Sequence, residues 1–405
     1  SKLLFLFIWI IKMNNKLLTP VVLSNLADGL FMGAIPLISY MLTSDPLIIT
    51  LLSIVRPVSI IVCGYKIENL TNNLSDSLYT SSICRVLVLF ALLFLSLMDM
   101  VNVFVFGAIV FLFSFMELIY DSTFSTLPKV VSKSEEEIKQ GYSKLQVSTT
   151  LSNDFIGPPL AALILTIASD NTLSGLILAL VVVSFLFSSP VRRTLDSIET
   201  SKTSSLTSNE ITEGFKMPSK AKSLLTYCCT ISMFTGAFTS VYVIHILSGL
   251  NFSKIDFGFL MVFFSLGVIL NHFVLSKYLT FTPKLDMFIS ICLIFMGTLI
   301  TSVSELYVML GFAQLLAGVG FVRWMVNESY IKQKLCKIED LNVLNAKFRM
   351  YETIAFSSGA VFSGMILKYT TFDTFDIYTL LFIFEMVVGV IFYKNYKEER
   401  GEVIE

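Results

Sequence analysis

Charged residues, histidine and tryptophan are scarce in this sequence of 405 residues. Asp, Glu, Lys and Arg together make up 15% of the chain, with two His and two Trp, whereas a soluble protein carries about 25% charged residues. So few charges cannot cover a globule in water, which argues against a soluble enzyme. The net charge of −1 excludes nucleic-acid binding as the main activity, because phosphates require a basic surface.

Residues that typically bind metals are also few. None of the six cysteines forms the close pairs with histidine that a zinc site requires. We interpret the cysteines as small apolar packing residues. The sequence therefore predicts no metal and no cofactor.

Apolar residues dominate instead, at 55% of the chain, with a mean hydropathy of +0.77. An apolar run of about 20 residues is long enough to cross a bilayer as a helix. Twelve such runs predict an all-α polytopic membrane protein, and they lie at residues 17–43, 46–65, 80–99, 101–127, 142–168, 172–190, 223–248, 256–276, 285–303, 306–331, 350–369 and 375–393.

The positions of lysine and arginine predict the orientation, because positive charge is retained on the cytoplasmic side. With the N-terminus inside, Lys254 and Lys368 lie at outward ends, and Arg56 and Arg323 lie within spans. The remaining basic residues are assigned to the cytoplasmic side. Both termini are therefore expected in the cytoplasm.

A polar, Ser/Thr-rich stretch with no apolar periodicity follows the sixth run and predicts a mobile linker. Short matches at an offset of 207 residues, including Gly29 with Gly236, suggest a duplicated six-helix unit. The expected domains are a cytoplasmic segment, a six-helix bundle, a cytoplasmic linker, a second six-helix bundle and a cytoplasmic tail, at residues 1–16, 17–190, 191–222, 223–393 and 394–405.

Five ionisable residues lie deep within the predicted spans, where a charge costs at least about 2.5–3.5 kcal/mol unless it faces a cavity or a partner. They are Asp28, Arg56, Glu117, Asp121 and Asp154. Asp28 is either a proton-accepting or cation-contacting carboxylate in the cavity, or a buried charge that fixes the packing of Arg56. Glu117 and Asp121 are spaced i and i+4 on one helical face, and they either line the pathway or reach water at its cytoplasmic end.

Two further charged residues, Arg323 and Glu328, lie near the inner end of the tenth span. We expect them to form a gating or structural pair at the cytoplasmic mouth.

With twelve spans, cytoplasmic termini and a central linker, the whole chain resembles the major facilitator superfamily. The segments LSNLADGLFMGAIPLISYMLT, NDFIGPPLAALIL and ITEGFKM resemble its branch of enterobactin, macrolide and microcin exporters. The resemblance implies two pseudo-symmetric six-helix bundles around a central cavity, in a bacterial inner membrane. It also implies a monomer that contacts lipid, protons and a small-molecule or short-peptide substrate.

Two motifs bear on the mechanism. Gly157-Pro158 resembles the core of the exporters' antiporter motif, and it predicts a helix bend with a tight interface, because proline removes a helical hydrogen bond and glycine permits close packing. In the loop after the second span, Gly64 and Glu68 match the superfamily signature, while Asn69 replaces its arginine. We expect Gly64 and Glu68 to belong to the inner gate.

These observations favour a proton-driven exporter of a small amphipathic solute, such as an antibiotic, a siderophore or an antimicrobial peptide. Asp28 would couple the proton to the substrate, tuned by the other deep charges. The alternatives are a nutrient importer or facilitator of the same fold and, from another class, a receptor or channel. An enzyme is not expected.

Overall fold

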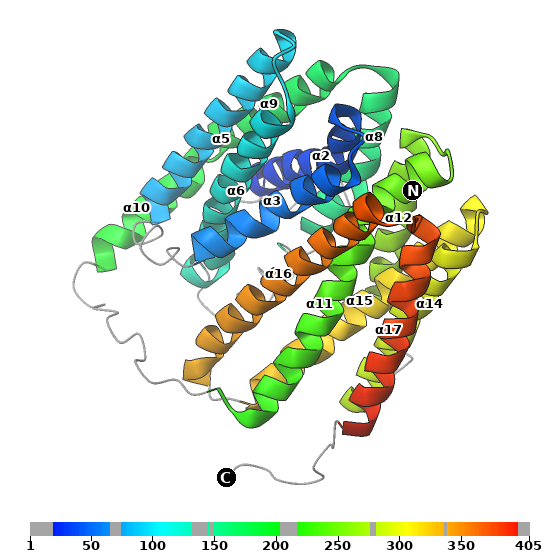
Figure 1. The fold of residues 1–405 in the computed structure, drawn as a ribbon. Coiled ribbons are helices and arrows are strands. Elements are labelled where there is room, and N and C mark those ends of the chain that lie inside the picture. Colours follow the sequence, from blue (N-terminus) through cyan, green and yellow to red (C-terminus); the bar gives the residue numbers. More distant parts are fainter. Residues whose placement is uncertain are drawn as a thin grey trace. The chain divides into compact units, whose positions relative to one another are not determined.

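The computed structural model describes residues 19–64, 74–131, 145, 149–202, 217–275, 281–335 and 338–395. Every apolar run predicted from the sequence contains a described helix, and the described residues include no strand (Figure 1). Within the described ranges, seven helices are long and apolar enough to cross a membrane, and two shorter apolar helices lie at Pro46–Val62 and Leu151–Ile167. The fold is therefore all-α, while the arrangement of twelve spans stays a prediction.

The chain forms two compact units, one made of residues 1–44 and 52–213 and the other of residues 45–51 and 214–405. The predicted boundaries of the two bundles, at residues 190 and 223, stay predictions. The segments 1–16 and 396–405 and residues 203–216 of the linker lie outside the described residues.

In the first unit, α2 (Thr19–Leu42) is the central helix. It packs against α6, α8, α9 and the π-helical segment η1, and α5 packs against α6 and α9. The helices α3 and α10 complete this unit, except that residues 46–51 of α3 belong to the second unit. The bounds are Pro46–Gly64 for α3, Leu74–Leu97 for α5, Val103–Val131 for α6, Thr150–Ile156 for η1, Gly157–Ile167 for α8, Asp170–Phe187 for α9 and Ser189–Lys202 for α10.

The second unit repeats this pattern. Its central helix α11 packs against α16 and α17, and α14 packs against α15 and α17. The bounds are Ser219–Ile244 for α11, His245–Gly249 for η2, Lys254–Leu270 for α12, Asn271–Leu275 for η3, Pro283–Val303 for α14, Tyr307–Leu335 for α15, Ile338–Tyr369 for α16 and Thr374–Asn395 for α17. In both units, therefore, the first helix packs on the fifth and sixth, and the third packs on the fourth and sixth.

Glycine permits the contact between the first and fifth helices in each unit. A Cβ on Gly29 would lie 2.5 Å from the carbonyl oxygen of Asn153, and one on Gly157 would lie 2.3 Å from the backbone of Gly29. In the second unit, a Cβ on Gly236 would lie 2.0 Å from the carbonyl oxygen of Phe356. Backbone atoms cannot move aside as side chains can, so these close approaches require glycine. The match of Gly29 with Gly236 thus corresponds to equivalent helix crossings.

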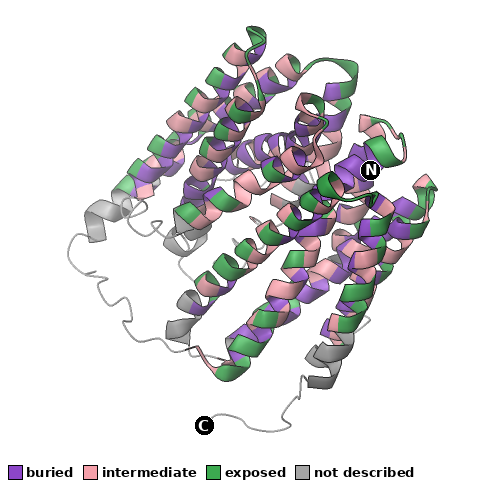
Figure 2. Ribbon diagram, in the orientation of Figure 1, coloured by how far each residue is buried: buried purple, intermediate pink, exposed green. Residues whose placement is uncertain are grey.

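Polarity in α5 is the reverse of that in a soluble helix. Its buried residues include several serines and Arg85, whereas its exposed residues include Leu87, Phe90 and Phe94. Figure 2 shows exposed and buried residues along the whole length of α5. A helix with polar groups inside and large apolar groups outside is suited to contact with lipid.

The prediction of a largely mobile linker from residue 191 does not hold for its first part, because residues 189–202 form α10. Val191 and Leu195 are spaced i and i+4 and are both buried, and they pack with Val21 and Leu78. The high density of Ser, Thr and charged residues concealed this short apolar stripe.

Candidate functional site

The first unit contains a buried ion pair between Asp28 of α2 and Arg85 of α5. Each side chain is 1% exposed. Ser24, one turn before Asp28, accepts a hydrogen bond from Arg85 Nη1 at 2.7 Å and donates one to Asp28 Oδ2 at 3.3 Å. Asp28 therefore has a direct cationic partner, and this partner is Arg85 rather than Arg56.

Aromatic rings surround the Arg85 guanidinium. Its Cζ lies 5.0 Å from the ring centroid of Phe113 and 4.8 Å from that of Tyr120, both on α6. The Tyr120 hydroxyl lies 3.2 Å from Ser184 Oγ on α9. The Nε of Arg85 is buried and has no hydrogen-bond partner among the described residues. Cation–π contacts thus take the place of water around much of this cation.

Arg85 is not among the deep charges predicted from the sequence. It lies inside the third apolar run, residues 80–99, but was assigned with the other basic residues to the cytoplasmic side. Arg85 could have been identified from the sequence, because a basic residue inside an apolar run indicates an intramembrane charge.

A second ion pair joins α3 to α6. Arg56 Nη2 lies 2.7 Å from Glu117 Oε1. The Arg56 side chain is 27% exposed, whereas that of Glu117 is 4% exposed, so the cation is accessible while the carboxylate is not. Asp121, one turn beyond Glu117 on α6, is exposed. The two carboxylates predicted to share one face thus differ in environment.

Gly157 and Pro158 lie where the fifth helix crosses α2. The helix changes from π to α geometry at Gly157, and Pro158 lies in the first turn of α8. A Cβ on Gly33 would lie 2.4 Å from Pro158 Cα. The structure thus contains a tight helix interface at the residues of this motif. Asp154 belongs to η1, but its side chain lies outside the described part of the chain, as does Glu68, while Gly64 ends α3.

Arg323 and Glu328, predicted to pair in the second unit, bind different partners. Arg323 forms an ion pair with Asp286 of α14 at 2.6 Å, and Glu328 forms one with Lys332 at 2.6 Å. The expected direct pair is therefore wrong. Asp286 lies at the start of α14, and the sequence alone did not show that α14 packs along α15.

Of the ion pairs among the described residues, Asp28–Arg85 is the most buried. A buried ion pair is tolerated in a folded protein only while each charge balances the other, because an uncompensated buried charge is strongly destabilising. Protonation of Asp28 would remove one charge and leave Arg85 with Ser24 and two aromatic rings. Proton binding at this point would therefore change how α2, α5 and α6 are held together.

No protein-family model matches the chain, and no curated protein matches it. Among solved structures, it is similar to a mutant of the nucleoside transporter NupG, with a TM-score of 0.71 and 15% identity, over 95% of this chain and 100% of that one. It is also similar to the human organic anion transporter MFSD10 (TETRAN), with a TM-score of 0.63 and 12% identity, over 92% and 99%.

A mutant of the peptide transporter POT is a further similar structure, with a TM-score of 0.72 and 10% identity, over 93% of each chain. Likeness at these identities shows the fold alone. The chain therefore shares the fold of transporters of different solutes. Together with the apolar helices, this indicates a multi-pass membrane protein.

Proposed function

We propose that the chain is a secondary active transporter of the major facilitator superfamily that works by alternating access. In this proposal it exports a small amphipathic solute, such as an antibiotic, a siderophore or an antimicrobial peptide, in exchange for protons. It would act as a monomer in the bacterial inner membrane, with both termini in the cytoplasm. The transporter fold supports the class of function, and the resemblance to exporters supports the direction.

The observation that carries the proton-coupling part is the buried pair of Asp28 and Arg85. In the proposed cycle, Asp28 accepts a proton and releases Arg85, and deprotonation restores the pair. Because Ser24 contacts both side chains, it would hold Arg85 near Asp28 in either state. Arg56 and Glu117 tune the local charge, and the crossing at Gly157 and Pro158 supports movement of α2 against α8.

The second candidate is an importer or facilitator of a nutrient. Arg56 favours it, because a guanidinium that is 27% exposed is suited to bind an anionic group. The structural likeness to transporters named for nucleosides, organic anions and peptides is equally compatible with import. The inner-gate roles of Gly64, Glu68, Arg323 and Glu328 remain part of the proposal in either case.

Liposomes that contain the purified chain and a trapped pH indicator would test the proposal. Ethidium serves as a cationic amphipathic probe, and uridine and dialanine serve as nutrient probes. We expect ethidium movement that depends on a pH gradient and is accompanied by proton movement. Asp28→Asn should abolish the proton movement, because an amide cannot exchange a proton.

The matched control is Asp76→Asn, which changes an exposed Asp in the first turn of α5 and should transport like the wild type. Full gradient-driven transport by Asp28→Asn would contradict the coupling role. Movement of uridine or dialanine, without movement of ethidium, would favour the nutrient transporter.

A further inference from the structure

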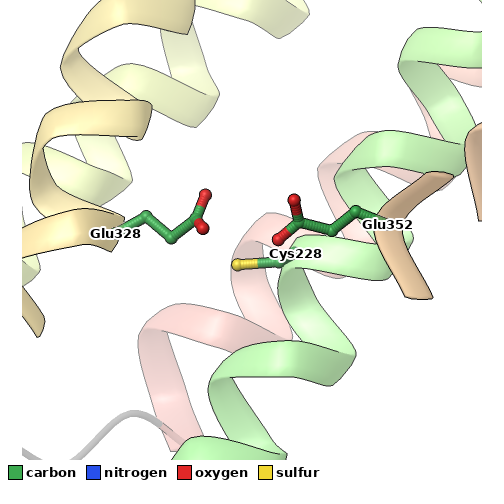
Figure 3. Close-up of side chains that lie close together, drawn as sticks. All are labelled: Cys228, Glu328 and Glu352. Carbon is green, nitrogen blue, oxygen red and sulfur yellow. The ribbon is translucent and has the colours of Figure 1, made fainter. Parts of the chain in front are cut away.

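Three side chains from three helices meet in the second unit: Cys228 of α11, Glu328 of α15 and Glu352 of α16. The sulfur and the carboxylate oxygens that face one another all lie within 4.8 Å. Figure 3 shows both carboxylates and the sulfur directed toward a common centre. Cys228 and Glu328 are buried, and Glu352 is half-buried. Cys228 also belongs to the buried core of this unit, as the packing role expected from the sequence requires.

The charges in this cluster do not balance. The groups that face Glu352 are Glu328 and Lys332 from α15 and Cys228 from α11. Lys332 Nζ lies 2.6 Å from Glu328 Oε1, so the one ammonium already has a carboxylate partner. Two ionised carboxylates and one ammonium would leave an excess negative charge in a largely buried place, which is costly.

An unpartnered atom marks where the missing positive charge belongs. Glu352 Oε1 is buried and has no hydrogen-bond partner among the described residues. A buried carboxylate oxygen without a donor is rare. Two carboxyl groups that share a site cannot both ionise readily, and one of them then retains a proton.

We propose that Glu352 and Glu328 form a proton-binding site in which Glu352 carries the proton. This site belongs to the second unit and is separate from the Asp28–Arg85 pair of the first. The proposal goes beyond the proposed function, because proton binding here does not depend on which solute is transported or in which direction. Lys332 already pairs with Glu328, and this leaves Glu352 as the group that carries the proton.

A proton fits the cluster better than a metal ion does. Cysteine and glutamate are both zinc ligands, but Lys332 occupies an oxygen of Glu328 at 2.6 Å, and a zinc ion would compete with that ammonium. A proton on Glu352 requires no such displacement. Its loss would place two like charges between α15 and α16 and weaken their contact.

Infrared difference spectroscopy on the full chain in lipid nanodiscs would test the proposal. We expect the carbonyl band of a protonated carboxylic acid at near-neutral pH in the wild type. Glu352→Gln should remove this band. On acidification from alkaline pH, the variant should also bind about one proton fewer per protein than the wild type. The matched control Glu305→Gln changes an exposed residue between α14 and α15 and should leave both signals unchanged.

Glu328→Gln provides a second test, because it keeps Glu352 in place but removes the like charge and frees Lys332 to pair with it. We expect the Glu352 band to disappear at near-neutral pH, a change that a purely structural glutamate would not show. Asp28→Asn should leave the Glu352 band intact, so this proposal and the coupling role of Asp28 can fail separately.

Persistence of the same carboxylic-acid band in Glu352→Gln, or its absence from the wild type at near-neutral pH, would overturn the proposal. So would tight binding of Cd²⁺ with a thiolate charge-transfer band that Cys228→Ser abolishes and Cys229→Ser retains, because the cluster would then be a metal site.

Discussion

The two units share a packing frame but differ in how their buried charges are balanced. In both, the first helix crosses the fifth at glycine, Gly29 in one unit and Gly236 in the other. In the first unit the carboxylates Asp28 and Glu117 each pair with an arginine from another helix. In the second, Glu328 pairs with Lys332 of its own helix, and Glu352 Oε1 is buried without a hydrogen-bond partner among the described residues.

The contact between the second and fourth helices differs as well. In the second unit α12 and α15 pack closely, and a Cβ on Gly318 would lie 2.1 Å from the carbonyl oxygen of Phe264. In the first unit Arg56 and Glu117 link α3 to α6 through a long side chain that is partly exposed. Small residues thus permit the helix packing that the two units share, whereas the buried charges differ between the units.

Bulk at the shared crossings should have the largest effect. Gly29→Leu and Gly236→Leu should each cost about 3 kcal/mol or more of folding free energy, because the new side chain would overlap backbone atoms. Gly175→Leu is the matched control, since no described atom outside the adjacent residues and backbone of its own helix lies within 4 Å of the position of its Cβ. Thermal unfolding in detergent measures the effect. If one crossing variant unfolded like the control, the two crossings would not be equivalent.

Loss of a buried cation should have the next largest effect. Arg85→Met leaves Asp28 as an unpaired buried carboxylate and should cost about 3–5 kcal/mol. Adding Asp28→Asn to Arg85→Met should recover much of the lost folding free energy, because no unpaired carboxylate then remains. Arg56→Met should cost less, because the Arg56 side chain is 27% exposed and water can replace part of it. Urea-induced unfolding compares the variants, and equal losses for Arg85 and Arg56 would show that burial does not distinguish the two pairs.

An exposed ion pair in the second unit should have the smallest effect. The hydrogen bond from Lys368 holds the pKa of Asp45 below its usual value of 3.8. A lowered carboxyl pKa stabilises the folded state above the usual value, and this contribution disappears as the pH falls through the lowered value. Lys368→Met should therefore lower the unfolding temperature slightly at neutral pH and not at strongly acidic pH. A pH-independent loss would indicate that packing, rather than charge, is responsible.

Much of the fold was predictable from the sequence. The positions of the helices follow from apolar runs of the right length, because a backbone in lipid must satisfy its hydrogen bonds internally. The prediction was wrong at α10, where Val191 and Leu195 form a stripe too short to detect in a polar segment. It was also incomplete at η1, because a proline and a glycine predict a break in a helix but not a π-helical turn before it.

The candidate site was only partly predictable. Asp28, Arg56 and Glu117 were identified because a charge in an apolar run is unusual. The sequence did not show which charges form ion pairs, since Asp28 and Arg85 are 57 positions apart and Arg56 and Glu117 are 61 positions apart. Glu352 was not identified either, because it lies close to the polar end of the run at residues 350–369, where a glutamate is expected to be solvated.

By itself, the sequence determined that this protein is a helical membrane protein with a few charges held inside it. That conclusion depends on local properties, namely the length of apolar runs and the high cost of isolated charges in lipid. Only the tertiary structure decided which charges neutralise one another and which carboxylate oxygens are buried without a hydrogen-bond partner among the described residues. Those facts depend on helix crossings between distant segments, and the electrostatic energy of a buried group is set by the neighbours that those crossings bring to it.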